Sequence, residues 1–174
     1  YKPERVFVSG VMRFDHYFRE NSGELSREEF LRSKGLNPSE KTVLITTVTR
    51  GNYKDEPEIV RGLIEARQKK LLPGFPNIFI RIHPKEDNYP AYQELAKYPA
   101  VHMERGGHEM AEEFGSHIEL DEGDLVNLKD TLRHSDVVVN YASTITLEAC
   151  VFDKPVVNIG FPEYYLNAYS FTHY

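Results

Sequence analysis

The amino-acid sequence predicts one α/β domain in which helices cover both faces of a parallel sheet. Short runs rich in β-branched residues alternate along the chain with longer stretches of helical periodicity, as expected of strands joined by crossover helices. The 174 residues match the size of one ordinary domain and are enough to bury a core. Apolar residues make up 40% of the chain and charged residues 28%, which excludes wholesale disorder.

The strands are predicted from runs of Val, Ile and Thr bounded by polar residues or by Gly and Pro. Four such runs are clear, at residues 42–49, 77–83, 136–140 and 155–159. Two weaker runs, at residues 5–9 and 100–104, predict further strands. The polar segment 10–22 has no clear period, so it is predicted to be irregular.

Four helices are predicted between these strands, at residues 26–34, 58–72, 123–134 and 144–152. The first opens on Ser26 with Glu29 three residues later, which is a capping box, and it ends at Gly35. The second places its apolar residues on one face and is stopped by Pro73 and Gly74. Their positions between the strands require crossover connections and therefore a parallel sheet.

Charge and cysteine content exclude several classes of function. The net charge is −6, so the basic excess that a nucleic-acid-binding surface requires is missing, and anionic ligands must be held by local groups. The single cysteine, Cys150, excludes an internal disulfide and a Cys-rich zinc site, and its apolar surroundings predict a buried structural thiol. No apolar run approaches the ~20 residues needed to cross a bilayer, so a cytoplasmic location is expected.

Polar residues gather directly after the clear strands. In an open parallel sheet, ligands bind beyond the carboxyl ends of the strands, where loops and helix N-termini meet. Arg50 and Gly51 follow the first clear strand, His83 ends the second, and Ser143 and Thr144 follow the third. These strand exits share one edge of the predicted sheet, and that edge is the candidate site.

The third exit carries the most specific pattern. Ser143 and Thr144 stand where a helix begins, and such an end binds phosphate through its N–H donors and its dipole. Glu148 follows one turn later, where a carboxylate can accept hydrogen bonds from the two hydroxyls of a ribose. The alternative is an ordinary N-cap followed by a glutamate that compensates the helix dipole.

The other two exits allow two interpretations each. Pro84 holds the chain extended after His83, whose imidazole can donate a hydrogen bond to a phosphate oxygen or transfer a proton to a leaving group. The alternative is a strand-end histidine that is bonded to the backbone. Arg50 and Gly51 are typical of a tight turn that faces an anion, and the alternative is a solvated loop.

No metal site is predicted. Histidines and acidic residues between positions 102 and 117 include His108, Glu109 and Glu112, but the His-Glu-x-x-His spacing is missing and glycines interrupt the segment, which favours a solvated connection. The sequence also lacks a Walker phosphate loop, a Gly-x-Gly-x-x-Gly fingerprint and a Gly-x-Ser-x-Gly elbow. Kinase, dehydrogenase and hydrolase functions are therefore disfavoured.

The stretch from Ser135 to Phe161 resembles the donor-site signature of GT-B-fold glycosyltransferases and their relatives. Among these relatives are the CDP-glycerol glycerophosphotransferases, capsule-polysaccharide enzymes and non-hydrolysing UDP-N-acetylglucosamine 2-epimerases. The matching positions are an aspartate before a strand, hydroxylated residues at a helix tip, a Glu-Ala pair and a Lys-Pro-Val strand, here Asp136, Ser143-Thr144, Glu148-Ala149 and Lys154-Pro155-Val156.

Two further stretches are similar to the same group. Arg81-Ile82-His83-Pro84 is similar to the His-Pro strand end of the glycerophosphotransferases. The segment that crosses between the two domains is similar to Arg5-Val6-Phe7-Val8-Ser9-Gly10 together with Arg13-Phe14-Asp15. The chain differs from the group at Val11-Met12, where Asn-Pro is usual. It also has Asn140-Tyr141-Ala142-Ser143 where the glycerophosphotransferases commonly have Asp-Tyr-Ser-Ser.

The resemblance implies a three-layer Rossmann-like α/β domain with a parallel sheet, the C-terminal half of a GT-B fold. Residues 1–15 would be a crossing segment left from a preceding domain, residues 16–160 the domain that binds the nucleotide donor, and residues 161–174 a second crossing segment. The acceptor site would lie on the N-terminal domain, which is missing from this sequence, so this chain alone would be inactive.

The resemblance also implies the substrate and the roles of the site residues. The substrate would be a nucleoside-diphosphate-activated donor, either a nucleotide sugar or a glycerol donor, and no cofactor would be needed. The donor phosphates would be bound by Arg50, Gly51, His83, Ser143 and Thr144, with His83 also catalytic, and Glu148 would bind the ribose.

The enzyme would be a glycosyltransferase of surface polysaccharide or glycan synthesis, and the full-length protein would be cytoplasmic, at the inner face of the membrane. The alternatives are a CDP-glycerol-type glycerophosphotransferase or a UDP-N-acetylglucosamine 2-epimerase of the same fold. An alternative from another class is a non-catalytic domain that keeps the fold for protein or glycan contacts.

Overall fold

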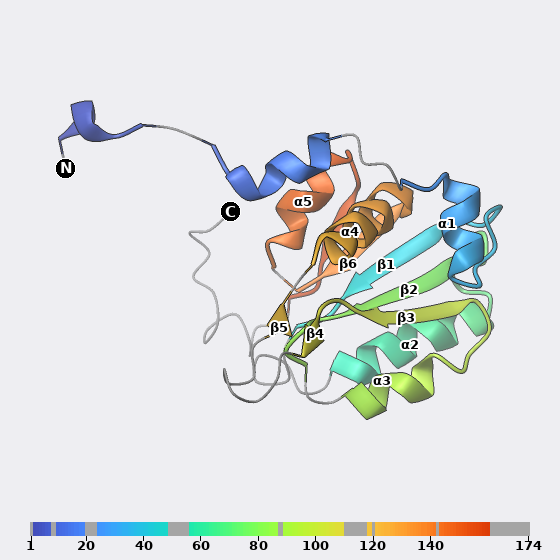
Figure 1. Cartoon of the computed structure of the whole chain (residues 1–174). Coiled ribbons are helices and arrows are strands. Elements are labelled where there is room, and N and C mark those ends of the chain that lie inside the picture. The colour runs from blue at the N-terminus through green and yellow to red at the C-terminus, as the bar shows by residue number, and fades with distance from the viewer. Residues whose placement is uncertain are drawn as a thin grey trace.

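A computed structural model describes residues 2–7, 10–19, 24–48, 56–86, 89–109, 118–119, 121–141 and 143–160. These residues form a three-layer α/β domain around a five-stranded parallel sheet with the strand order β3-β2-β1-β6-β7 (Figure 1). The fold class predicted from the sequence is confirmed. Among the described helices, none combines the length and the hydropathy that crossing a membrane requires.

The five strands of the sheet are short, and β1 lies at its centre. Ile45 of β1 lies opposite Ile80 of β2 on one side and opposite Val139 of β6 on the other. A separate two-stranded antiparallel pair is formed by β4 (His108–Glu109) and β5 (Ile118–Glu119). The strands of the main sheet are β1 (Thr42–Thr46), β2 (Asn77–Ile82), β3 (Val101–Arg105), β6 (Val137–Asn140) and β7 (Val156–Asn158).

Helices cover both faces of the sheet, as Figure 1 shows. One face carries α1 (Arg27–Ser33), α4 (Glu122–His134) and α5 (Ile145–Val151). The other face carries α2 (Glu56–Gln68) and α3 (Tyr89–Leu95). The capping box predicted at Ser26 is present, because its hydroxyl accepts from the backbone of Glu29 while the Glu29 carboxylate accepts from the backbone of Ser26.

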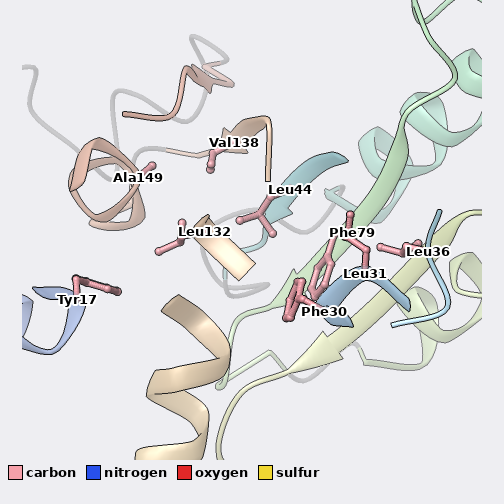
Figure 2. Packing of buried hydrophobic residues seen from close by; sticks show 9 residues of the cluster. All are labelled: Tyr17, Phe30, Leu31, Leu36, Leu44, Phe79, Leu132, Val138 and Ala149. Atoms are coloured by element: carbon pink, nitrogen blue, oxygen red, sulfur yellow. The ribbon is translucent and has the colours of Figure 1, made fainter. Parts of the chain in front are cut away.

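The core has two halves, because successive residues of a strand point to opposite faces of the sheet. Leu44 of β1 points toward α1, α4 and α5 and packs with Phe79, Leu132 and Val138 (Figure 2). Its neighbour Ile45 points toward α2 and α3 and belongs to the second cluster. Each large side chain buried in this way stabilises the fold by about 1.5–3 kcal/mol.

The structure corrects the prediction for the N-terminal segment. Residues 5–7 form no strand: a short 3-10 helix, η1 (Pro3–Arg5), ends at Arg5, and the side chain of Phe7 is exposed. The segment predicted to be irregular contains a second 3-10 helix, η2 (Met12–Phe18). Tyr17 of η2 is buried and joins the core cluster beside α5, a contact that polar neighbours hid in the sequence pattern.

Two other expectations are also corrected. Helix α3 was not predicted, because its seven residues include Pro90 and bury only Tyr92 and Leu95, too few to show a helical period. Cys150 was expected to be buried but is exposed. Ala149 occupies the position of α5 that faces the sheet, so the next residue points away from it.

The amino edge of the sheet is held together by one carboxylate. Asp136 accepts hydrogen bonds from the Nη2 of Arg27 (2.8 Å), the Nζ of Lys41 (2.9 Å) and the backbone N–H of Thr42 (2.9 Å). Burial acts to raise the pKa of Asp136, but the bonds from Lys41 and Thr42 and the charge of Arg27 outweigh it, so the pKa lies below its usual range. The hydrogen bonds of Asp136 therefore link α1, β1 and β6 at the edge opposite the candidate site.

Candidate functional site

The strand order reverses between β1 and β6, and this reversal locates the candidate site. The connection after β1 runs through α2 on one face, whereas the connection after β6 runs through α5 on the opposite face. In open parallel sheets a crevice opens at the carboxyl edge where neighbouring strands diverge in this way, and ligands bind there. The predicted Ser143 and Thr144 border this point, whereas Arg50 and Gly51 lie outside the described residues.

Asn140 organises the turn that leaves β6. Its side chain is fully buried, and its Oδ1 accepts from the backbone N–H of Ser143 (3.2 Å). Its Nδ2 donates to the Oγ1 of Thr146 (2.5 Å), which in turn donates to the Oδ1 of Asn158 (3.3 Å). A carboxylate could accept but could not donate, so the bond to Thr146 in this direction depends on the amide of Asn140.

Ser143 and Thr144 have different places at the tip of α5. The Oγ of Ser143 accepts from the backbone N–H of Ile145 (3.2 Å), so both its hydroxyl and its N–H are used within the turn. Thr144 is exposed, and its side chain makes no capping bond. In the part of the chain that the structure describes, no group accepts a bond from the N–H of Thr144. Ser143 therefore supports the tip, and Thr144 presents donors to solvent.

Glu148 lies beneath η2, on the side of α5 that joins the core. Its side chain is 2% exposed, and its Oε2 accepts a hydrogen bond from the hydroxyl of Tyr17. Tyr17 is held in place by an edge-on contact with Phe152, whose ring centroid lies 5.5 Å away. The hydroxyl of Tyr17 therefore occupies one of the acceptor positions that a ribose would use. An aromatic residue in a polar segment was the only sequence signal for this contact.

His83 follows β2 and is half-buried. Its backbone N–H donates to the Oγ1 of Thr47 (2.8 Å), and its Nδ1 accepts from the backbone N–H of Lys85 (3.1 Å). Burial lowers the pKa of the imidazole, and the charges of Lys85 and Arg105 lower it further. Within the described residues, no protein group is hydrogen-bonded to Nε2. The side chain thus presents one unused nitrogen at the carboxyl edge.

Glu56 at the exit of β1 was not found by sequence reasoning. It is fully buried at the start of α2, where its carboxylate accepts from the backbone N–H of Val48 (3.1 and 3.2 Å to its two oxygens) and from the hydroxyl of Tyr92 (2.8 Å). Burial raises its pKa to about 8, against the opposing effect of the Tyr92 and Val48 hydrogen bonds. The raised pKa shifts Glu56 toward its protonated form, at the start of α2 beside the exit of β1.

Arg81 does not serve the candidate site directly. Its guanidinium forms an ion pair with Glu104 of β3, which also contacts the Nζ of Lys34 (2.7 Å) and the amide of Asn127 (2.7 Å). Burial acts to raise the pKa of Glu104, but the neighbouring His102 imidazole (Nε2 3.6 Å from Oε2) and the charges of Arg81 and Lys34 lower it to about 2. The charge of Arg81 is therefore paired with Glu104, on the face of the sheet that carries α1 and α4.

The histidine and acidic segment considered for metal binding falls mostly outside the described residues. The side chains of His108 and Glu109 and all of residues 110–117 are not described. Among the described side chains, no group of three His, Cys, Asp or Glu residues could hold a metal ion. The segment 161–174, predicted to cross to another domain, also lies outside the described residues.

Comparison with known proteins gives matches among solved structures. No protein-family model matches the sequence, and no curated protein matches it. The S. aureus MnaA–UDP co-structure is similar over 84% of this chain and 33% of the MnaA chain, with 16% sequence identity and a TM-score of 0.55. Thermosulfurimonas dismutans KpsC, a beta Kdo 2,4 transferase, matches over 89% of this chain and 47% of its own, with 16% identity and a TM-score of 0.41.

Both of these similar proteins are longer than this chain. The chain spans about a third of the length of MnaA and about half that of KpsC. At 16% identity, the likeness to MnaA establishes the fold, a Rossmann-like domain of three layers.

Proposed function

We propose that this chain is the donor-binding half of a GT-B-type glycosyltransferase and binds a nucleoside-diphosphate-activated donor, a nucleotide sugar, at the carboxyl edge of its sheet. The observation that carries the proposal is the reversal of strand order between β1 and β6, with the tip of α5 beside it. The fold shared with the UDP-bound MnaA supports it, because that protein holds a nucleoside diphosphate.

The diphosphate would lie across the end of β1. Neighbouring strands are about 4.8 Å apart, so β2 and β6, on either side of β1, are separated by about 10 Å at this edge. On one side the N–H and hydroxyl of Thr144 would bind phosphate oxygens, supported by Ser143 and by the dipole of α5. On the other side His83 would bind a second phosphate oxygen. Arg50 and Gly51, which follow β1 in sequence, would supply the donors between them.

Glu148 would bind the ribose. A carboxylate accepts two hydrogen bonds from a vicinal diol, and the hydroxyl of Tyr17 already makes one bond of that kind to Glu148. A ribose hydroxyl would therefore replace the tyrosine hydroxyl with a bond of the same type. The net charge of −6 means that the donor is recruited by these local groups and not by the overall field of the protein.

The chemical step would be the departure of the nucleoside diphosphate from the transferred sugar. Negative charge grows on the leaving phosphate, and fixed N–H donors with a helix dipole stabilise it in the transition state. The acceptor would be positioned and activated by a preceding domain of the full-length protein, and the reaction would belong to surface polysaccharide or glycan synthesis at the inner face of the membrane. This chain alone would bind nucleotide weakly and turn over nothing, because positioning needs both domains.

Calorimetric titration of this chain and of a longer protein that includes the preceding domain tests the proposal. We expect one of UDP, CDP, GDP and ADP to bind, and to bind more tightly than its monophosphate. His83→Ala and Glu148→Gln should each weaken that binding, whereas Lys97→Ala in the exposed turn after α3 should not. Unchanged binding in both site variants would refute the assigned roles. If no nucleotide binds to the longer protein, a non-catalytic domain of the same fold becomes the better explanation.

A further inference from the structure

The two ring nitrogens of His83 in the candidate site have different surroundings. One ring nitrogen is bonded within the protein and the other is not. We infer that Thr47 and the backbone N–H of Lys85 are positioning groups that fix His83 as a neutral imidazole whose Nε2–H is the hydrogen-bond donor at this edge. The inference rests on the proposed function and specifies what His83 does in it.

The first observation is the bond between the backbone N–H of Lys85 and the Nδ1 of His83, which are 3.1 Å apart. A backbone amide is always a donor, so Nδ1 must be the acceptor and carries no proton. In a neutral imidazole the proton is then on Nε2. Pro84 stands between the two residues with a fixed φ angle, and its carbonyl accepts from the Nε of Arg105 (2.8 Å), so the turn is held from the side of β3 as well.

The second observation is the way in which the β1–β2 ladder ends. The backbone N–H of Thr47 donates to the carbonyl of Arg81 (3.0 Å), as the parallel ladder requires. The next N–H, that of His83, donates instead to the side-chain Oγ1 of Thr47 (2.8 Å). Thr47 is 4% exposed, so its hydroxyl is a fixed acceptor. This side chain determines where His83 leaves the sheet and therefore where its ring stands.

The charges around the ring favour the neutral form. Lys85 and Arg105 are both cationic, and half-burial removes part of the water that would stabilise an imidazolium. Protonation of Nδ1 would also break its bond with Lys85, because two donors would then face each other. The geometry and the charges thus select the same protonation state.

This state decides between the two roles that the sequence left open. A neutral imidazole with its proton on Nε2 donates a hydrogen bond to an anionic oxygen, such as an oxygen of a diphosphate. It does not transfer that proton to a leaving group, because loss of its only ring proton would leave an imidazolate anion. It cannot act as a base there either, because Nε2 carries the proton and the lone pair of Nδ1 is engaged by Lys85. His83 would then stabilise the charge of the departing diphosphate by hydrogen bonding, without transferring a proton.

Nitrogen NMR of the histidine rings tests the protonation state directly. In uniformly 15N-labelled protein at pH 7, long-range correlation spectra distinguish protonated from unprotonated ring nitrogens, and His83→Gln assigns the signals among the seven histidines. We expect His83 to show a protonated Nε2 and an unprotonated Nδ1. An imidazolium, or a proton on Nδ1, would overturn the inference. The measurement needs no nucleotide, so it is independent of the proposed function.

A matched pair of valine substitutions tests the positioning role of Thr47. Thr47→Val removes the acceptor of the His83 N–H, whereas Thr46→Val removes a buried hydroxyl that has no partner among the described residues. We expect Thr47→Val to weaken UDP binding about tenfold and Thr46→Val to change it by less than about twofold. Equal effects of the two changes, or none in Thr47→Val, would overturn the role of Thr47.

Two further variants keep the test informative if Thr47→Val fails to fold. Thr47→Ser keeps the hydroxyl and should retain the binding of the wild-type protein. His83→Gln places an amide N–H near the position of Nε2 and should retain more binding than His83→Asn, whose amide reaches only the position of Nδ1. A stronger loss in the Gln variant than in the Asn variant would contradict the assignment of Nε2 as the donor. If none of UDP, CDP, GDP and ADP binds the wild-type protein, the proposed function is refuted and the NMR result still stands.

Discussion

Polar residues lie at both edges of the sheet, but they make different hydrogen bonds there. At the amino edge, polar groups bond between elements: Asp136 joins α1, β1 and β6, and the amide of Asn77 bonds both ways with the backbone of Asn37. At the carboxyl edge, the polar groups of His83 and Asn140 bond mainly within or beside their own turns, and the donors of Thr144 face solvent. The first edge holds the fold together, and the second holds ligand-facing groups in place.

Because the two edges differ in this way, mutations at one edge should mainly change stability, and mutations at the other should mainly change nucleotide binding. Changes at the amino edge should lower the free energy of unfolding and leave nucleotide affinity intact. Changes at the carboxyl edge should weaken nucleotide binding, and they should also lower the free energy of unfolding where the changed group is buried, as Glu56 and Asn140 are. The four predictions below test this separation, from the largest expected effect to the smallest.

Asp136→Ala should destabilise the protein by about 2–4 kcal/mol, because it removes a carboxylate with three donors and leaves the backbone N–H of Thr42 unpaired. Chemical denaturation at pH 7 measures this loss. Since the folded-state pKa of Asp136 is lowered, its stabilisation is present above about pH 4 and is lost as the pH falls through the folded-state value. UDP affinity should be unchanged. A variant that keeps its stability but loses UDP binding would break the distinction between the edges.

Glu56→Gln should flatten the dependence of stability on pH. The pKa of Glu56 is raised in the folded state, so the folded protein holds a proton that the unfolded chain releases, and wild-type stability falls as the pH rises from about 4.5 to about 8. The Gln side chain can still accept from Val48 and contact Tyr92 without charge. Unfolding curves from pH 5 to 9 for both proteins measure the effect, with Glu28→Gln on the exposed face of α1 as the control. Parallel pH curves would show that Glu56 is not the titrating group.

Asn140→Asp should destabilise the protein by about 1–2 kcal/mol and weaken UDP binding, because a carboxylate cannot donate to Thr146 and is repelled by the carbonyl of Ser143. The matched control is Asn158→Asp, which keeps the acceptor that Thr146 uses and is exposed. Thermal unfolding and calorimetry on both variants give the answer. If the two variants behave alike, the amide of Asn140 does not organise the turn.

Tyr17→Phe should have the smallest effect on stability, about 1 kcal/mol, because it removes one donor from the buried carboxylate of Glu148. UDP should bind a few-fold more tightly, since the ribose no longer competes with the tyrosine hydroxyl. Comparison of UDP with its 2′-deoxy analogue measures the share that the ribose contributes. Tyr98→Phe, which lies on the opposite face of the sheet, is the control. Weaker UDP binding in Tyr17→Phe would instead mean that Tyr17 orients Glu148 for the ribose.

The features that could be predicted from the sequence are those with a local pattern in the chain. The strands that form the sheet were predicted to within a few residues, and the signal was clearest for β1, β2 and β6, which are mostly apolar runs largely buried in the sheet. The position of Ser143 and Thr144 beside the strand reversal also followed, since a helix start after a strand has a local signature. The assignment of ligand roles to His83, Thr144 and Glu148 remains a prediction.

Other features could not be predicted because they depend on contacts between residues far apart in the chain. Tyr17 and Glu148 are separated by 131 positions, and no local pattern relates them. The burial of Glu56 depends on Tyr92 of α3, a helix that was itself missed. Cys150 was misjudged because an apolar neighbourhood in sequence does not show which side of a short helix faces the sheet.

The exposure of Cys150 gives this protein a built-in reporter. It is the only thiol in the chain, and it stands on α5 two residues after Glu148, so a fluorophore attached there would label a single place without any engineered cysteine. Displacement of the Tyr17 hydroxyl by a ligand would change the surroundings of α5 and with them the emission of the dye. A stopped-flow experiment on such a conjugate would give the rate at which η2 releases Glu148, a quantity that equilibrium titrations do not contain.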